Sequence, residues 1–405
     1  MDRGPLHPLV GAARRRWHAT SARTLHDAAL DLGGLLLKAG QFVGTRADLL
    51  PDAYVRTLSE LQDHAPAHPY AVIRRVIEDE LGAPPDRLFA RFWHRPMASA
   101  SLAQVHRAWL HDGRDVAVKV QRPEIPSSLR FDFRNLALAL RTIERIEGPL
   151  GLRLLLDQLE ECLPRELDFV AEARSAARMR ELLRGQPSLY VPEPLFDLTT
   201  RRVVVSEYLA GIKITRRRRL EAAGIDPGAV ARELARSYAE QILRLGFFHA
   251  DPHPGNLLVL RAHQAPGGFR IALVDFGLVQ EVPESFRAAL LELLAGVFAQ
   301  QTVRVAQALG SLGLRSRSRD ENALRRSAEH LIGAVSRWRS GTHAQRGHRP
   351  AHELIALLRS DPFVELPAHL VLIARVIGLV AGVTRSLGQR LDLAPVVLPY
   401  LAGQS

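Results

Sequence analysis

The sequence predicts an α+β fold in which N-terminal helices precede a small β-sheet and a longer, mainly helical remainder. Three observations predict this fold. Apolar residues recur at helical spacing over 18–42, two β-like segments within 101–121 enclose a turn, and the chain from about residue 284 onward has helical periodicity. The 405 residues are enough for two or three packed units.

The composition is that of a folded protein with a basic balance. Hydrophobic residues make up 47%, charged residues 24%, and the formal net charge is +11. Basic residues are nevertheless interspersed with acidic ones, and no zinc-finger or aromatic–basic RNA motif is found, so we expect no nucleic-acid partner. The arginine-rich runs at 13–16 and 216–219 are interpreted as solvated faces, with attraction to anionic lipid headgroups as the alternative.

Three features bear on location. The single cysteine, Cys162, excludes an internal disulfide framework and fits a reducing compartment. The N-terminus has no uninterrupted apolar stretch, so no signal peptide is expected. The apolar segment 366–383 has Arg375 at its middle, and because a charge is costly at a bilayer centre, we expect a buried helix and no transmembrane span. The expectation is a cytoplasmic protein.

A contact with the membrane surface remains a separate hypothesis. Arg14, Arg15, Arg16 and Trp17 precede the amphipathic helix predicted at 18–42, and this combination is typical of helices that lie on anionic lipid. The alternative is that the apolar stripe of this helix packs on the body of the protein.

The remaining elements follow in order along the chain. The periodicity predicts helices near 52–62, 69–81, 123–147, 153–183 and 228–245, a hairpin from strands at 101–110 and 116–121, and strands at 201–211 and 269–279. Pro164 should divide or kink the fourth helix. We expect a helical extension at 1–90, a small lobe with the sheet at 91–210, and a larger lobe at 211–405.

The lysines single out a candidate phosphate-binding residue. Lysine occurs only at Lys38, Lys119 and Lys213, although Lys and Arg together number 54. A lysine retained in such an arginine-rich chain suggests a role that needs a compact ammonium rather than a planar guanidinium. Lys119 lies in the strand-like segment "VAVKV" with apolar neighbours on both sides. A lysine that merely snorkels from a half-buried strand is the alternative.

The segment "ELDFVAEA" at 166–173 supplies three carboxylates. Asp168 and Glu172 are four residues apart and are expected to share a helix face, whereas Glu166 and Glu172, six apart, should point in different directions. One helix could then hold two cations. We expect Glu172 to pair with Lys119, and Glu166 with Asp168 to face Lys38; a solvated acidic face is the alternative.

Two further segments carry candidate catalytic and metal-binding residues. In "HADPHPGN" at 249–256, the spacing from Asp251 to Asn256 equals that between the catalytic Asp and the metal-binding Asn of a kinase catalytic loop. In "VDFGL" at 274–278, Asp275 matches the residue that chelates Mg²⁺, and Gly277 is expected to allow the turn. Phosphoryl transfer needs these parts: a lysine for phosphate oxygens, an acid that holds it, a catalytic Asp and oxygen ligands for Mg²⁺.

In their order, "KAGQ", "ASASLAQVH", "VAVKVQRP", "ELDFVAEA", "HADPHPGN" and "VDFG" resemble the motifs of the UbiB/AarF family of atypical kinase-like proteins, over roughly residues 20–300. The resemblance implies a two-lobed kinase-like fold with a helical extension over the active site. It also implies that Lys38 and Gln41 of the extension point into that site toward Glu166 and Asp168. The function implied is a Mg-ATP-dependent kinase or ATPase linked to ubiquinone and isoprenoid-lipid metabolism.

The resemblance also identifies nucleotide-binding candidates. An alanine-rich loop covers the nucleotide in that family, and the strand at 201–211 runs into a turn that adds two further candidates. The candidates are Ala98, Ser99, Ala100, Ser101, Lys119, Glu207 and Leu209. Ser99 departs from the alanine usual at its position, which leaves the preference between ATP and ADP open because a hydroxyl could contact a phosphate.

Departures from the motifs of ordinary protein kinases indicate which class of molecule accepts the phosphate. No GxGxxG is found, Ala250 stands where kinases carry a phosphate-receiving Arg, and His253 stands where a Lys often touches the transferring phosphate. About eight residues separate Gly277 from the helical pattern that begins at 284, which is too short for a peptide-docking segment. ATP hydrolysis, or transfer to a small or lipid-like molecule, therefore fits better than protein phosphorylation.

Two other classes of function were weighed. A metallohydrolase could use the alternating side chains of His249, Asp251 and His253 with Asp275, although the ligand set for zinc or iron is incomplete. In the simpler interpretation, His249 packs and hydrogen-bonds under the loop. A non-catalytic, nucleotide-gated scaffold at a membrane surface is the remaining alternative.

Overall fold

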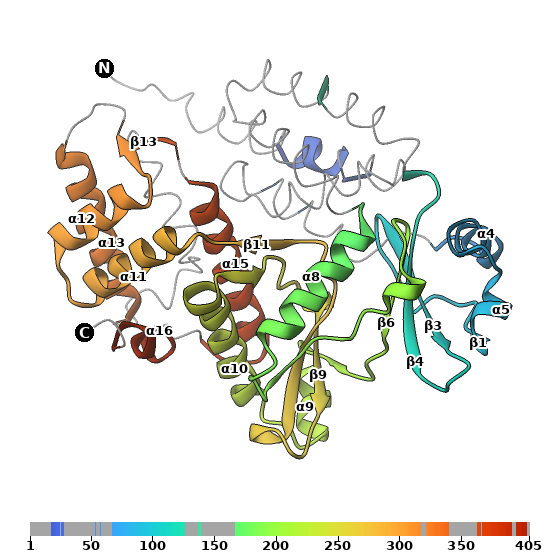
Figure 1. Ribbon diagram of the computed structural model, residues 1–405. Helices are drawn as coiled ribbons and strands as arrows, with labels where there is room; N and C mark the ends of the chain where they lie inside the picture. Colours follow the sequence, from blue (N-terminus) through green and yellow to red (C-terminus); the bar gives the residue numbers. More distant parts are fainter. Residues whose placement is uncertain are drawn as a thin grey trace. The chain divides into compact units, whose positions relative to one another are not determined.

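The computed structural model describes residues 18–24, 26–27, 53, 57, 67–125, 137–138, 167–316, 321–339, 363–365, 367–390 and 394–402 (Figure 1). The chain separates into two compact units, the first formed by Met1–Arg174 with Glu193–Tyr208 and the second by Ser175–Pro192 with Leu209–Ser405. One boundary therefore falls inside helix α8 (Phe169–Leu182), and another falls directly after Tyr208. The mixture of helices and small sheets confirms the predicted α+β class.

The first unit contains a five-stranded antiparallel sheet. Its strands are β1 (Arg91–Phe92), β2 (Ala98–Ser99), β3 (Ala103–Trp109), β4 (Asp115–Gln121) and β6 (Val203–Glu207), in the order β1-β3-β4-β6 with β2 also paired to β3. Strands β3 and β4 form the predicted hairpin, in register from Ala103 opposite Gln121 to Trp109 opposite Asp115. The turn between them needs Gly113, whose φ of 87° is rarely adopted by other residues.

The alternating pattern of β4 decides which side chains enter the core of the first unit. Val116, Val118 and Val120 are buried in one apolar cluster with residues of helix α4 (Tyr70–Leu81), which lies where a helix was predicted. The helix contributes Ile73, Val76 and Ile77 to that cluster, and the short helix α5 (Pro85–Leu88) follows it. Because successive strand side chains point to opposite faces, Lys119 lies on the face away from this core.

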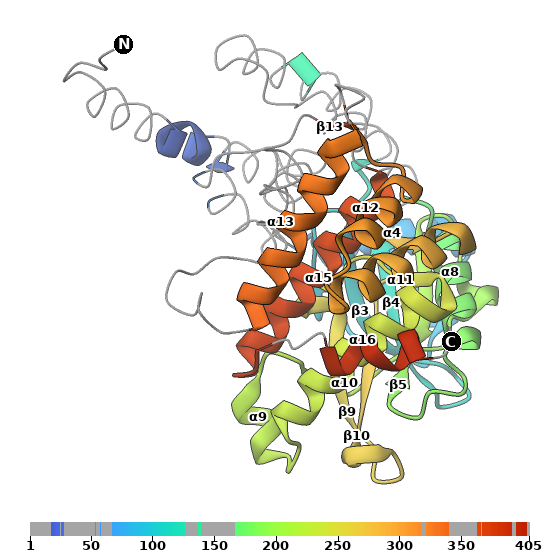
Figure 2. The same ribbon diagram turned by 90° about the vertical axis from the view of Figure 1, so that its left-hand side faces the viewer.

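The second unit contains a four-stranded sheet and a set of helices. The strands are β5 (Leu189–Tyr190), β10 (Phe269–Leu273), β9 (Leu257–Arg261) and β7 (Ile212–Lys213), in that order, with β8 (Phe247–His249) and β11 (Val279–Glu281) as a separate antiparallel pair. The helices are α9 (Arg217–Ala222), α10 (Pro227–Ala239), α11 (Glu284–Phe298), α12 (Thr302–Ser311), α13 (Glu321–Arg339), α15 (Ala368–Ser386) and α16 (Ala394–Leu401). Helices α11, α12 and α13 pack consecutively on one another (Figure 2).

Several predicted boundaries differ from the structure. The strand expected at 201–211 ends at Glu207, and the one expected at 269–279 consists of β10, an irregular segment and β11. The remainder after residue 284 is not wholly helical, because Arg315–Ser316 (β12) pairs with Phe363–Glu365 (β13). Two-residue strands carry too little alternation to be recognised from sequence. The helices predicted near 52–62 and 123–147 lie largely outside the described residues.

Helix α15 covers the apolar segment in which a buried helix was expected. By length and composition alone, His369–Ser386 could cross a membrane, and no other helix among the described residues meets that test. In the structure, α15 contributes Ile373, Val376 and Val380 to the core of the second unit and packs against α10. Core helices of globular proteins have the same length and apolarity, so these properties do not define a span.

Helix α10 leads the chain toward the "HADPHPGN" segment, and its start is defined by a side-chain cap. The carboxylate of Asp226 accepts hydrogen bonds from the backbone N–H groups of Gly228 and Ala229 at 2.8 and 2.9 Å, with Pro227 at the first helical position. These bonds, led by the one from Gly228, lower the pKa of Asp226. The helix continues as a π-helix over Glu240–Leu245 and ends at Gly246, whose φ is 65°.

We expect Asp226→Ala to lower the free energy of unfolding by about 1 kcal/mol at neutral pH, because two backbone donors lose their acceptor. Since the folded-state pKa is depressed, the contribution is present above the unfolded-state pKa and is lost as pH falls through the folded-state value. Urea unfolding of both proteins at neutral and acidic pH measures this. Glu233→Ala, on the same helix beyond its first turn, is the control, and an equal cost of Asp226→Ala at both pH values would contradict the capping role.

Candidate functional site

An ion pair links the sheet of the first unit to helix α8. Lys119 Nζ donates to Oε1 and Oε2 of Glu172 at 2.8 and 2.9 Å. The Lys119 side chain is 19% exposed and that of Glu172 is 8% exposed, so the pair is largely shielded from water. This is the contact expected from the sequence. The alternative, in which the head of Lys119 only extends from a half-buried strand into solvent, does not fit a lysine paired in this way.

The start of α8 is held against the sheet so that Glu172 faces Lys119. Gln121 Nε2 donates to Leu167 O at 3.2 Å, and the N–H of Phe169 donates to Arg201 O at 3.2 Å. The ring of Phe169 lies 5.1 Å from Lys119 Nζ. An apolar cluster accompanies these contacts and consists of Ala103, Phe169, Ala173 and Val204. Packing and backbone contacts together determine where the carboxylate lies.

Asp168 has a role that the sequence interpretation did not assign to it. Its Oδ1 accepts hydrogen bonds from the N–H groups of Val170 and Ala171, both at 3.1 Å, so Asp168 caps α8. A short acceptor side chain before an apolar run is an N-cap signal that could have been recognised. Lys38, Gln41 and Glu166 lie outside the described residues, so their predicted contacts with Asp168 stay predictions.

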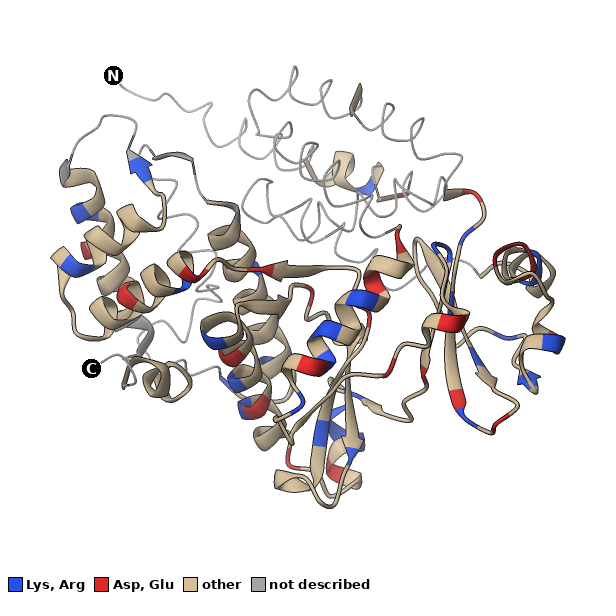
Figure 3. Ribbon diagram, viewed as in Figure 1, with Lys and Arg blue, Asp and Glu red and all other residues tan. Residues whose placement is uncertain are grey.

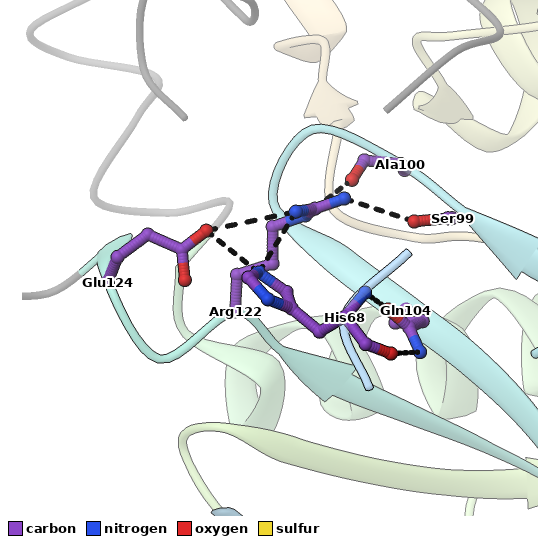
Figure 4. A network of polar contacts seen from close by, with 6 residues as sticks. All are labelled: His68, Ser99, Ala100, Gln104, Arg122 and Glu124. Atoms are coloured by element: carbon purple, nitrogen blue, oxygen red, sulfur yellow. Dashed lines mark hydrogen bonds and ion pairs between the residues drawn. The ribbon is translucent and has the colours of Figure 1, made fainter. Parts of the chain in front are cut away.

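The alanine- and serine-containing loop at 98–101 is held by Arg122, which the sequence interpretation missed (Figure 4). Arg122 Nε donates to Ala100 O at 2.9 Å, Nη2 donates to Ser99 Oγ at 3.0 Å, and the Arg122 N–H donates to Leu102 O at 3.0 Å. Arg122 lies three residues after Lys119, and its guanidinium thus holds the loop at 98–101 next to the end of the strand that carries this lysine. The hydroxyl of Ser99, the departure from the family pattern, is an acceptor for this arginine.

A wider polar network holds Arg122 from its other side (Figure 4). Its Nη1 lies 3.0 Å from His68 Nε2, which lies 3.0 Å from Glu124 Oε1. Gln104 accepts from the His68 N–H at 2.8 Å and donates to His68 O at 3.3 Å. Burial lowers the pKa of Arg122, and the charge of Glu124 opposes that shift. The planar guanidinium donates to the loop through Nε and Nη2 while Nη1 contacts His68 on the other side, which a lysine ammonium could not do in this geometry.

In the second unit, Asp251 and Asn256 occupy an ordered loop between β8 and β9. Asp251 O accepts from the N–H of His253 at 2.7 Å and from Nδ2 of Asn256 at 3.2 Å. The amide orientation of Asn256 therefore leaves its oxygen for another partner. Ala250 is fully buried, so this position does not admit the arginine found in ordinary kinases. The side chain of Asp251 contacts Arg375 of α15.

Asp275 adopts a backbone conformation that few residues accept. Its φ is 63°, in the left-handed region, and its Oδ1 accepts from the Gly277 N–H at 3.3 Å. His249 Nε2 donates to Asp275 O at 2.7 Å from a ring that is fully buried and packed against Phe276. Gly277, which was expected to allow the turn, takes part in it through this N–H, while the left-handed backbone conformation falls at Asp275 and not at Gly277.

The donor set of this region suits a hard cation with oxygen ligands. Asn256 directly precedes β9 and Asp275 follows β10, and Leu257 pairs with Leu273, so both side chains start from the same end of the sheet. The Val274 N–H donates to Asn256 O at 3.0 Å, which holds the two segments together. An amide oxygen and a carboxylate are ligands that Mg²⁺ accepts.

The metallohydrolase alternative finds no support in the described part of the chain. No group of three or more His, Cys, Asp and Glu residues there could hold a metal ion. Nδ1 of His249 lies 3.4 Å from the Asp251 N–H, which donates to it, while Nε2 donates to Asp275 O. Both ring nitrogens are engaged with backbone groups, which is the packing role that the simpler interpretation assigned to His249.

The two remaining nucleotide-binding candidates lie at the end of β6. Glu207 is its last residue and pairs with Val116, and its N–H donates to Glu193 O at 2.9 Å. Leu209 begins the next compact unit, and its carbonyl accepts from Gly211. The chain thus passes from the first compact unit to the second where the turn was predicted. The contact of Glu207 and Leu209 with a nucleotide stays a prediction.

A strand lysine paired with a helix glutamate, together with an Asp–Asn loop and an Asp placed after the next strand, defines a protein-kinase-like protein. The model of the ABC1 atypical kinase-like domain matches residues 60–309. The chain belongs to this family, which is the UbiB/AarF family, and the resemblance found in the sequence is confirmed.

Similar proteins were found in plants, animals and bacteria. The chain is 31% identical over 411 residues to the chloroplastic protein ACTIVITY OF BC1 COMPLEX KINASE 8 of Arabidopsis thaliana, covering 94% of this chain and 53% of that protein. It is 36% identical over 296 residues to AarF domain-containing protein kinase 1 of Gallus gallus, covering 73% and 57%. The chain thus spans little more than half the length of these relatives.

A solved structure supports the fold. The structure described as the complex of Rv3197 with erythromycin from Mycobacterium tuberculosis matches with a TM-score of 0.63 at 24% identity, covering 97% of this chain and 99% of that chain. At this identity the similarity concerns the fold alone. It agrees with the kinase-like arrangement that the sequence motifs predicted.

We expect His249→Phe to lower the free energy of unfolding by about 1–3 kcal/mol. Phenylalanine keeps a ring against Phe276, but the carbonyl of Asp275 loses its buried donor. His263→Phe, at an exposed position, is the control and should change stability by less than about 0.5 kcal/mol. Urea unfolding measures both, and stoichiometric zinc or iron lost with His249 would contradict the packing role.

Proposed function

We propose that the chain binds Mg-ATP and either hydrolyses it or transfers its terminal phosphate to a small or lipid-like acceptor. The shielded pair of Lys119 with Glu172 carries this proposal. The Glu172 carboxylate holds the ammonium in one position, and a strand lysine held in this way is suited to bind phosphate oxygens. The loop at 98–101, held by Arg122 next to this strand, would cover the nucleotide.

The second unit would supply the metal ligands and the catalytic carboxylate. Asn256 and Asp275 would hold Mg²⁺, which neutralises charge on the phosphates when bound. Asp251 would accept the proton of the attacking hydroxyl or water as its oxygen approaches phosphorus. Three hydrogen bonds to main-chain carbonyls orient this loop and support the assignment. The N–H of His253 and Nδ2 of Asn256 donate to Asp251 O, and the N–H of Val274 donates to Asn256 O.

The segment after Asp275 supports a small acceptor rather than a protein. Helix α11 begins at Glu284, and within the few residues before it β11 is paired with β8. That leaves no extended segment on which a peptide could dock. The lipid class, and a role in ubiquinone or isoprenoid-lipid metabolism, rest on the family resemblance.

A contact with anionic lipid is part of the same proposal. Among the described residues, one observation supports it. Arg216–Arg219 are all exposed at the start of α9, although Arg217 is paired with Glu221. Opposite charges are interspersed along α8 and α10 (Figure 3), whereas Arg216–Arg219 are consecutive and exposed, so this run is a local concentration of positive charge within the described residues.

We expect Lys119→Met to reduce Mg-dependent ATP turnover by about 10²-fold or more, because a preorganised charge on the phosphates is removed. Lys213→Met is the matched control, since Lys213 is exposed on β7 and its loss should leave turnover unchanged. Turnover is measured as phosphate release with and without Mg²⁺. Thermal-shift titration with ATP and ADP measures nucleotide binding in the same variants.

Asp275→Asn separates the enzyme from the scaffold alternative. It should abolish turnover while leaving Mg-free nucleotide binding largely intact, because it removes a metal ligand and not a phosphate contact. Nucleotide binding by the wild type without any turnover would refute the catalytic proposal and favour a nucleotide-gated scaffold. Absence of nucleotide binding would refute both.

We expect Ser99→Ala to lower the thermal midpoint without changing the ratio of ATP to ADP affinity. The Ser99 hydroxyl accepts a hydrogen bond from the buried Arg122, and bonds to charged groups contribute about 1.5–3 kcal/mol. Ser206→Ala on the same sheet is the control. Unchanged stability combined with a several-fold change in the affinity ratio would instead show that the hydroxyl contacts a phosphate.

A further inference from the structure

An arginine from helix α15 reaches the candidate catalytic carboxylate. Arg375 Nη2 donates to Oδ1 of Asp251 at 3.5 Å, across 124 residues of sequence. The Arg375 side chain is 14% exposed and that of Asp251 is 31% exposed. Both residues belong to the second compact unit. The contact is therefore an internal, partly buried ion pair of that unit.

The surroundings of Arg375 make this pairing unusual. Arg375 is flanked in α15 by Ile373, Ala374 and Val376, which are all buried in the core. A guanidinium among such residues is costly unless a partner offsets its loss of water. Asp251 provides one such partner. The family model ends at residue 309, so the arginine comes from a part of the chain beyond the matched domain.

Within its own loop, Asp251 is held by hydrogen bonds to its backbone N–H and carbonyl groups. His249 accepts from the N–H of Asp251, and His253 and Asn256 donate to its carbonyl. Nδ1 of His249 and Nδ1 of His253 each accept from a backbone N–H of the loop. The charged group that meets Oδ1 comes from α15.

We propose that Arg375 is a positioning residue, which holds the carboxylate of Asp251 in one orientation for the phosphoryl-transfer or hydrolysis step. The inference rests on the proposed function, because it gives Asp251 the role of proton acceptor. A guanidinium suits this task, since it stays charged and its planar group, set among buried side chains of α15, presents Nη2 to one carboxylate oxygen. One oxygen is held by Arg375, and the other is left for the attacking group.

This contact gives α15 a second function besides filling the core. The helix is apolar enough to resemble a membrane span, yet its central charge is engaged with the catalytic loop. Core packing of Val376 and Val380 determines where Arg375 lies, and Arg375 in turn orients Asp251. Small shifts of the helix would therefore alter the catalytic loop directly.

The test compares Arg375→Met and Arg375→Lys with Arg385→Met, a matched control at an exposed position of the same helix. We expect Arg375→Met to reduce kcat for Mg-dependent ATP hydrolysis by about 10²-fold, the scale of effect that follows a misplaced catalytic group. The dissociation constant for ATP should change by less than about twofold, because Arg375 does not hold the nucleotide. Arg375→Lys should recover part of kcat, and Arg385→Met should match the wild type.

A double variant with Asp251→Asn tests whether the arginine acts through the carboxylate. In the Asp251→Asn background, Arg375→Met should cause no further loss of kcat, since the two residues then act as a unit. Circular dichroism and the thermal midpoint verify folding, and Arg375→Lys replaces Arg375→Met in the cycle if the latter does not fold.

Three outcomes would overturn the inference. Wild-type kcat in a folded Arg375 variant, additive losses in the double variant, or an equal loss in Arg385→Met would each show that Arg375 does not position Asp251. Absence of turnover in the wild type would instead overturn the proposed function, and this inference with it. The two failures are therefore distinguishable.

Discussion

The contact between Lys119 and Glu172 is the constraint on which the first unit depends. Each charge is shielded from water, and each would destabilise the fold if it lost its partner. The sheet can place a lysine on this face because the alternation of β4 buries its valines against α4 on the other. Helix α8 can bring a glutamate to it because Asp168 caps the helix and Phe169 packs on the sheet.

The second unit uses backbone geometry where the first uses a charge pair. His249 is fully buried and holds the carbonyl of Asp275, which has a left-handed backbone conformation. Such conformations persist only where surrounding contacts over-determine them, and they are concentrated at functional sites. The paired strands β9 and β10 then bring Asn256 and Asp275 to one end of a sheet. The loop is therefore held by hydrogen bonds to the main chain.

Two arginines connect these local arrangements to the rest of their units. Arg122 links the loop at 98–101 to His68 and Glu124, and Arg375 links the loop that carries Asp251 to helix α15. Both guanidinium groups are largely buried, and both contact acceptors far away in sequence. In this arginine-rich chain, Arg122 and Arg375 differ from solvated arginines because the folded structure buries them next to specific hydrogen-bond partners.

The sequence by itself determined the hairpin, helix α4, helix α10 and the residue types of the candidate site. These features depend on periodicity, spacing and turn residues, which act within a few positions of one another. Only the tertiary structure decided that the left-handed backbone conformation falls at Asp275, and that Arg122 and Arg375 have specific partners. The physical reason is that a hydrogen bond across 23 or 124 residues leaves no local pattern in the sequence, because its two ends meet only when the apolar elements between them have packed.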